Sequence, residues 1–324
     1  MDKKTYSNLI VSSAPHIVSP MDTSRIMLMV IIGLLPSLLV STYVFGFRVI
    51  TLSAVCVIAS VAFEWIWNAL MKKPQTVGDL SAAVTGLLIA FNVPSGLPYW
   101  IAVLGCFVAI IVVKQLFGGV GKNLTNPAIT ARVVLFISYA TEMTTWTLPR
   151  MAADATSTAT PLGVLAEGGT LPSNMQMFLG FIGGSMGEVS AVALLLGGLF
   201  LIWKKIISPI IPACFIGTVF VFAAVYYAVT GTGDPLQMAI FHVLAGGVML
   251  GAFFMATDYV TSPILPMGKV IFGVGCGLIT MLIRLFGSYP EGVSFSILLM
   301  NVLCPLIDNF CQKRMYGGAK KNEK

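Results

Sequence analysis

The chain has 324 residues, of which 57% are hydrophobic and only 10% are charged, and its mean hydropathy is +0.91. Soluble domains carry about 25% charged residues, so this composition excludes a water-soluble globular protein and indicates an integral membrane protein. The net charge of +6 does not indicate nucleic-acid binding, because the Lys and Arg residues lie between apolar stretches and form no basic stripe with interleaved aromatic residues.

Ten apolar stretches follow a polar N-terminal segment, and most approach the roughly 20 residues that a helix needs to cross a bilayer. The first has no small-residue cleavage site after it and is predicted to be a retained anchor. The third is too short to cross alone and stops at Asn92-Val93-Pro94, and residues 176–186 are predicted to re-enter the membrane. The ten stretches are 26–46, 48–70, 79–91, 98–117, 127–140, 187–203, 208–230, 238–256, 267–286 and 291–311.

The two halves of the chain show weak internal similarity at an offset of 169 residues. The matches are Pro94 with Pro263, Ile110 with Ile279, and Leu116-Phe117-Gly118 with Leu285-Phe286-Gly287. Two halves of five spans each must be inverted relative to one another, as in many transporters. The fold expected is therefore an all-α membrane protein with about ten transmembrane helices in two inverted five-helix repeats, including broken or re-entrant segments. The predicted divisions are a cytoplasmic segment 1–25, a first repeat 26–138, an outer loop with the re-entrant segment 139–187, a second repeat 188–311 and a basic tail 312–324.

The distribution of Lys and Arg predicts the orientation. With an inner N-terminus and ten spans, all but four of the 19 basic residues fall in inner segments. The exceptions are Arg48, Arg132, Arg150 and Arg284. The positive-inside rule then places both termini in the cytoplasm and the connection 139–175 on the outer face of the membrane.

Charged residues in or near apolar stretches are costly and often functional. Glu188 and Asp258 are the candidates for an ion pathway, because both lie beside Gly- or Pro-interrupted backbone that can supply carbonyl ligands. Glu64 and Asp79, close to the predicted cytoplasmic edge, are interpreted as structural charges. Arg132 either contacts a bound cofactor or neutralises a buried carboxylate. No metal site is predicted, because the two histidines, His16 and His242, are too few and too far apart.

The outer connection contains a cluster of hydroxyl residues, Asp154-Ala155-Thr156-Ser157-Thr158-Ala159-Thr160-Pro161-Leu162. Taken alone, such a cluster is typical of a solvated loop or a helix cap. It also resembles the flavinylation site of the NqrB/RnfD family, whose members are membrane components of the Na⁺-translocating quinone reductase and of the Rnf electron-transport complex. Further segments resemble that family over nearly the whole chain, among them Asn126-Pro127-Ala128 with Arg132, Gly183-Gly184-Ser185-Met186-Gly187-Glu188, residues 254–263 and Glu291-Gly292.

The resemblance implies a cofactor and its attachment site. In the family, FMN is joined through its phosphate to a threonine, and the matching position is Thr160. Thr158 stands where glycine is common, which is a departure from the family pattern. The other residues that the resemblance places at this cofactor are Asp154, Ser157, Thr158, Ala159, Pro161, Leu162, Arg132 and Asn126. Family members can also hold a second, noncovalent flavin (riboflavin) among the helices.

The same resemblance implies a location, the inner membrane of a bacterium or archaeon, and a function. It is that of a flavin-carrying component of the Rnf complex, relaying electrons between ferredoxin and NAD⁺ with linked Na⁺ or H⁺ translocation. Its partners would be the other Rnf proteins (RnfA, RnfB, RnfC, RnfE and RnfG), a flavin transferase for maturation, and lipid. No catalytic side chain is expected, since the redox chemistry belongs to the flavin. The residues alone leave open a cofactor-free channel or secondary transporter of the urea or ammonium type, and an assembly scaffold.

Overall fold

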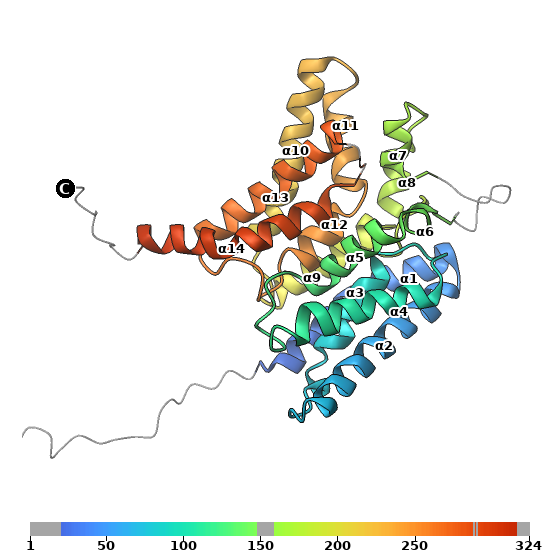
Figure 1. The fold of residues 1–324 in the computed structure, drawn as a ribbon. Helices are drawn as coiled ribbons and strands as arrows, with labels where there is room; N and C mark the ends of the chain where they lie inside the picture. Colours follow the sequence, from blue (N-terminus) through green and yellow to red (C-terminus); the bar gives the residue numbers. More distant parts are fainter. Residues whose placement is uncertain (1–20, 148–158, 288, 290, 316–324) are drawn as a thin grey trace, which may run out of the picture.

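The structure is a computed structural model, and it describes residues 21–147, 159–287, 289 and 291–315. The regular elements in these residues are helices, arranged as Figure 1 shows. In chain order they are α1 (Thr23–Phe45), α2 (Arg48–Leu70), η1 (Val77–Asp79), α3 (Ser81–Phe91), α4 (Tyr99–Phe107), η2 (Val108–Gln115), α5 (Pro127–Ser138), α6 (Ala140–Thr144), α7 (Pro161–Ala166), α8 (Asn174–Leu179), α9 (Ala191–Trp203), α10 (Ile210–Thr230), α11 (Pro235–Leu244), α12 (Val248–Leu250), η3 (Gly251–Met255), α13 (Pro266–Phe286) and α14 (Val293–Met315).

Within the described residues, five helices are long and apolar enough to cross a membrane: α1, α2, α10, α13 and most of α14. A sixth candidate consists of α11 and the segment Val248–Met255, which meet at a bend of 62°. Four further apolar helices (α3, α4 with η2, α5 and α9) are shorter, at 10–17 residues. All ten predicted stretches coincide with helices, but length and composition support five or six crossings.

Local sequence explains why some of these helices are short. α3 ends at Asn92, whose side chain donates to the carbonyl of Leu88 (2.6 Å), and Pro94 follows. α5 begins at Asn126, whose side-chain oxygen accepts from the amides of Ala128 (3.0 Å) and Ile129 (3.3 Å). An asparagine N-cap followed by proline at the first helical position is a strong helix start. Both helices therefore end or begin well inside the molecule.

The two halves of the chain pack in a similar way. In the first half α2 lies against α3 and α4, and in the second half α10 lies against α11 and α13. The halves meet where α1 crosses α9 and where α5 contacts α14 (Figure 1). At the first crossing, a β-carbon on Gly197 would lie only 2.0 Å from the carbonyl oxygen of Gly33. Such close approach of two backbones is typical of membrane helix pairs.

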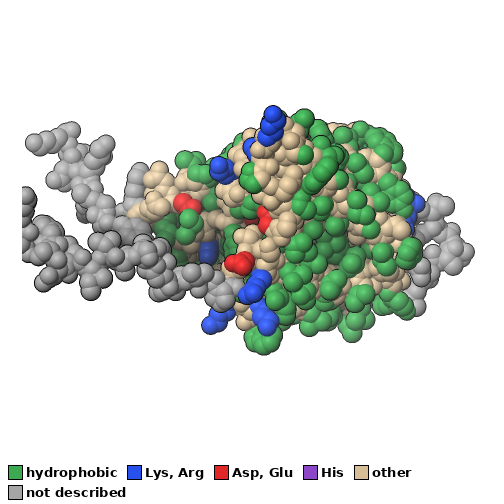
Figure 2. All heavy atoms as spheres, turned by 90° about the horizontal axis from the view of Figure 1, so that it is seen from below, with side chains coloured by type: hydrophobic (Ala, Val, Ile, Leu, Met, Phe, Trp, Pro, Cys, Tyr) green, Lys and Arg blue, Asp and Glu red, His purple; other side chains and the backbone are tan. Residues whose placement is uncertain are grey.

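The surface matches a lipid environment. In the view of Figure 2, hydrophobic side chains cover a broad area, whereas Lys, Arg, Asp and Glu side chains gather in a smaller one. Large apolar side chains are exposed along the long helices, for example Leu39, Ile58, Trp65 and Val229. A soluble monomer rarely exposes so much contiguous apolar surface. The protein is thus a helical multi-pass membrane protein.

Candidate functional site

A cluster of four charges lies between the two halves of the molecule. The guanidinium of Arg132, in α5, donates through Nη1 to Glu188 Oε1 (3.0 Å) and to Asn92 Oδ1 (2.9 Å), and through Nη2 to Glu291 Oε2. Side chains of Arg132 and Glu188 are only 8% and 4% exposed, and that of Glu291 is 17% exposed. Buried charges are tolerated only when they are paired and hydrogen-bonded, as here. Arg132 thus neutralises buried carboxylates, which is one of the two roles predicted for it, and its contact with a cofactor stays a prediction.

Glycine at the break between α11 and α12 makes room for this cluster. A β-carbon on Gly247 would lie 2.7 Å from Glu188 Oε1. The fourth charge, Arg284 of α13, reaches the same break and donates to the carbonyls of His242 (2.5 Å) and Ala245 (2.8 Å). The last carbonyls of a helix have no partner within that helix, and a cation there is also favoured by the helix dipole. Arg284 thus stabilises the interrupted end of α11.

A cavity of about 380 Å³ adjoins the charge cluster. Charged, aromatic and hydroxyl side chains line it, principally Arg132, Glu291, Phe136, Trp146, Tyr289, Thr144 and Thr160. The rings of Phe136 and Tyr289 pack edge to face, with their centroids 5.4 Å apart. Ligand cavities in proteins typically measure about 300–1,000 Å³ and combine apolar walls with a few placed polar groups. This cavity has the size and lining of a small-molecule site.

Thr160 lies at the cavity wall as the N-cap of α7. Its hydroxyl oxygen accepts from the amide of Gly163 (3.1 Å), and the residue is only 7% exposed. The helix cap expected for an isolated hydroxyl cluster is therefore present. The arrangement also brings Thr160 and Arg132 to one cavity, although 28 positions separate them in the sequence.

Only some of the other residues predicted around the cofactor lie at or near this cavity. Ala159 lines the same cavity, and Pro161 and Leu162 are buried at the start of α7. Asn126 does not line it; it caps the opposite end of α5 and lines a second cavity. Asp154, Ser157 and Thr158 lie outside the described residues.

That second cavity, of about 110 Å³, contains Asp258 in its wall. The Asp258 carboxylate accepts from Thr261 Oγ1 (3.2 Å) and more weakly from the amide of Val260 (3.4 Å). Glu188, the other residue predicted for an ion pathway, lies in the charge cluster instead. The two carboxylates are therefore in different sites, and Glu188 is paired with an arginine.

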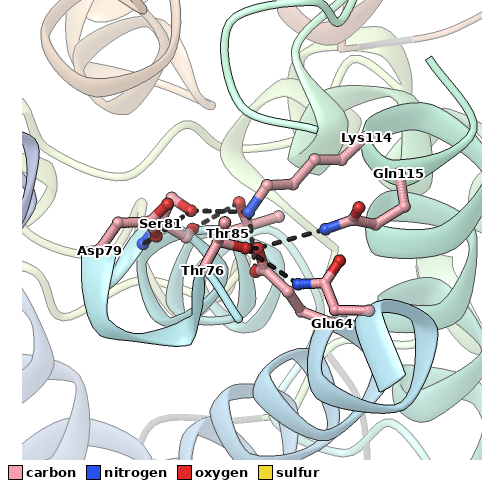
Figure 3. Close-up of polar contacts among 8 residues, drawn as sticks. Glu64, Thr76, Asp79, Ser81, Thr85, Lys114 and Gln115 are labelled. Atoms are coloured by element: carbon pink, nitrogen blue, oxygen red, sulfur yellow. Dashed lines mark hydrogen bonds and ion pairs between the residues drawn. The ribbon is translucent and has the colours of Figure 1, made fainter. Parts of the chain in front are cut away.

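A further buried ion pair lies at the start of α3 (Figure 3). The Lys114 ammonium, in η2, donates to Glu64 Oε2 (2.9 Å) and to Ser81 Oγ (2.6 Å). Thr76 and Gln115 donate to the other oxygen of Glu64, at 2.7 and 3.2 Å. Asp79 accepts from the amide and the hydroxyl of Ser81, at 2.8 and 2.5 Å. Glu64 and Asp79 are satisfied by these contacts, which agrees with their interpretation as structural charges.

Sequence reasoning missed two members of these sites. Glu291 belongs to a segment that resembles the family, yet no role was predicted for it, although a carboxylate just before an apolar span is a usable signal. Lys114 was counted as an inner-face lysine, but it is only 3% exposed and ion-paired.

Comparison with known proteins gives consistent matches. A family model described as the NQR2, RnfD, RnfE family matches residues 10–317. The chain is 51% identical over 317 residues to a component of the Na(+)-translocating ferredoxin:NAD(+) oxidoreductase complex of Acetobacterium woodii, covering 97% of this chain and 96% of that protein. It is 42% identical to the corresponding component of the proton-translocating ferredoxin:NAD(+) oxidoreductase complex of Clostridium ljungdahlii (95% and 96% covered). It is 40% identical to that of the ion-translocating oxidoreductase complex of Stutzerimonas stutzeri (90% and 92% covered).

Proposed function

We propose, because this chain belongs to the NQR2, RnfD, RnfE family, that it is the flavin-carrying membrane subunit of an ion-translocating ferredoxin:NAD⁺ oxidoreductase. The observation that carries the proposal is the cavity that Thr160, Arg132 and Glu291 share with three aromatic rings. In this role the chain works within a complex of several subunits, as the names of its relatives describe for those proteins.

The side chains of the cavity suit FMN attached through its phosphate. The Thr160 hydroxyl would carry the phosphoester, and Phe136, Trp146 and Tyr289 offer apolar faces to a planar ring system. The Arg132 guanidinium supplies a fixed positive charge at the wall. When bound, the flavin accepts and passes on electrons; the protein binds it, orients it and sets the electrostatic field around it.

We also propose that the helices form ten membrane segments in two inverted repeats. Equivalent contacts in the two halves support it. Arg132 of α5 donates to the side chain of Asn92, after α3 (2.9 Å). In the second half, the corresponding residue is Asn301 of α14. With its side-chain amide oriented so that both the nitrogen and the oxygen are paired, it donates to the carbonyl of Thr261, which follows η3 (3.1 Å). Both members of the second pair lie 169 positions beyond those of the first, which is the offset of the sequence matches.

Both halves contain irregular helix, but not at equivalent positions. The π-helical segment η2 lies in the fourth apolar stretch of the first half, whereas η3 lies in the third apolar stretch of the second half. π-helical turns are rare and concentrate at functional sites. With both termini in the cytoplasm and ten membrane segments, as proposed, the Thr160 cavity would lie toward the outer face and the Asp258 cavity toward the inner face.

The proposal is tested by making the chain with and without an active flavin transferase and viewing denaturing gels under ultraviolet light. A fluorescent band at the mass of the chain, 34.6 kDa, is expected only with the transferase. A dark band, with the transferase shown to modify another substrate, would contradict the flavin role and favour the cofactor-free transporter.

Asp258 is proposed as a residue of the ion pathway, because its carboxylate lines a cavity. Its hydrogen-bond donors among the described residues, the Thr261 hydroxyl and the Val260 amide, are both neutral. In vesicles that contain the complete complex, the variant Asp258→Asn is expected to lose most of the ion uptake that is coupled to electron transfer. Assembly and the covalent flavin should persist, because asparagine has nearly the same size. The control is Asp234→Asn, the same substitution at an exposed aspartate that caps the start of α11. Uptake at the wild-type level in Asp258→Asn would remove Asp258 from the pathway.

A further inference from the structure

Glu291 is the carboxylate of the charge cluster that opens to the cavity. It lies in the connection between α13 and α14, lines the cavity wall, and is the acceptor for Arg132 Nη2. Its side chain is 17% exposed, about four times as much as the 4% of Glu188, which accepts from the other terminal nitrogen of the same guanidinium. Glu291 can therefore exchange a proton with the cavity, whereas Glu188 is closed off behind Arg132.

The charges facing Glu291 come from several elements. Arg132 of α5 and Arg284 of α13 favour the carboxylate, whereas burial and the neighbouring Glu188, before α9, favour the protonated acid. Burial has the largest effect, and together these surroundings raise the pKa of Glu291 to about 7. Glu167 also lines the cavity but is exposed to solvent. Tyr289, which lies in the connection between α13 and α14 as Glu291 does, lines the cavity as well. Near neutral pH the Glu291 carboxyl is thus present in both forms.

We propose that Glu291 is a redox-linked proton-binding residue for the cofactor of this cavity. Reduction of a flavin held here by another redox centre of the complex would add a negative charge to the cavity, and Glu291 would take one proton from the solvent on the cavity side to compensate it. On reoxidation, Glu291 would return that proton to the solvent. No bond to the cofactor forms or breaks, and charge balances at each stage. The inference rests on the proposed flavin function.

Thermodynamic linkage makes this proposal measurable. If the arrival of an electron favours protonation of Glu291, protonation must favour reduction of the cofactor by the same free energy. The cofactor's midpoint potential should then fall as the pH rises through the Glu291 titration, because ionisation puts a negative charge beside it. Arg132 positions both carboxylates, because it donates to Glu188 and to Glu291 through its two terminal nitrogens.

The experiment is a spectroelectrochemical titration of the purified, flavinylated chain at several pH values from 6 to 8. Wild type is compared with Glu291→Gln and with Glu167→Gln, whose exposed side chain lines the same cavity and is screened by water. Glu291→Gln should match the wild-type potential at pH 6, be more positive at pH 8, and so lose the part of the pH dependence that Glu291 contributes. Glu167→Gln should follow the wild type. Identical potentials in wild type and Glu291→Gln at every pH would overturn the inference.

A second readout does not depend on the potential. Proton uptake on photoreduction, followed with a pH indicator in weak buffer, should decrease in Glu291→Gln relative to the wild type. If that variant fails to fold, Glu291→Asp keeps a titrating carboxyl and should retain the uptake; its loss there would count against the inference. Absence of covalent flavin in the wild type would instead refute the proposed function, so the two failures are distinguishable.

Discussion

Replacing Thr160 with valine is expected to abolish covalent flavin while leaving the chain folded in the membrane. Valine is close to threonine in shape but has no hydroxyl to carry a phosphoester. The cost to folding is limited to one helix cap on α7, about 1 kcal/mol. The measurement is ultraviolet fluorescence of the 34.6 kDa band after denaturing electrophoresis, with the transferase present.

Thr144→Val is the matched control, because Thr144 lines the same cavity and its hydroxyl donates to the carbonyl of Ala140 (2.8 Å). That variant should fluoresce like the wild type. Undiminished fluorescence in Thr160→Val would move the attachment to another hydroxyl, with Thr158 the first to examine.

Replacing Arg132 with methionine is expected to destabilise the protein strongly. The change leaves two carboxylates, Glu188 and Glu291, and the amide oxygen of Asn92 without their shared donor. Breaking a buried ion pair by removing one partner costs about 3–5 kcal/mol, because the remaining charge stays buried and unpaired. The measurement is the thermal unfolding midpoint in detergent of protein made without the transferase, so that loss of cofactor does not contribute.

Two further variants test this reason. The triple variant Arg132→Met, Glu188→Gln, Glu291→Gln removes all three charges and should recover much of the lost stability. Arg48→Met removes an exposed arginine that donates to the carbonyl of Gly96 (3.0 Å), and should change stability by about 1 kcal/mol or less. A triple variant no more stable than Arg132→Met alone would show that packing around Arg132, and not its charge, is what matters.

The positions of the helices follow from hydropathy, but their lengths do not. α1, α2, α10 and α13 are continuous apolar runs, so their ends could be predicted within a few residues. The boundary at Asn92 was also predictable, because Pro94 follows it. The π-helical turns were not, since they arise from a local shift in backbone pairing that Val108–Gln115 and Gly251–Met255 do not reveal by composition.

The candidate site was predictable only in part. Thr160 and Arg132 came from a resemblance, and the structure brings them to one cavity. Asn126 came from the same resemblance, in the segment that also contains Arg132. Six residues along a helix amount to roughly 9 Å, however, which is enough to put Asn126 in a different cavity. The partners of Arg132 could not be predicted from the sequence. Glu291 is 159 positions away, and nothing in the sequence says which carboxylate an arginine will contact.

If Thr160 carries the proposed flavin, the way it is held has a consequence for biosynthesis. The residue is only 7% exposed, and its hydroxyl oxygen accepts from the Gly163 amide as the cap of α7, so a modifying enzyme has little access to it in the closed structure. The enzyme would have to act on a segment in which α7 has opened locally, either before this part of the chain has closed or during a transient opening. Closure and modification would then compete during maturation. A chain that closes first becomes a poor substrate, and cells that make the protein faster than the enzyme can act would accumulate it without cofactor.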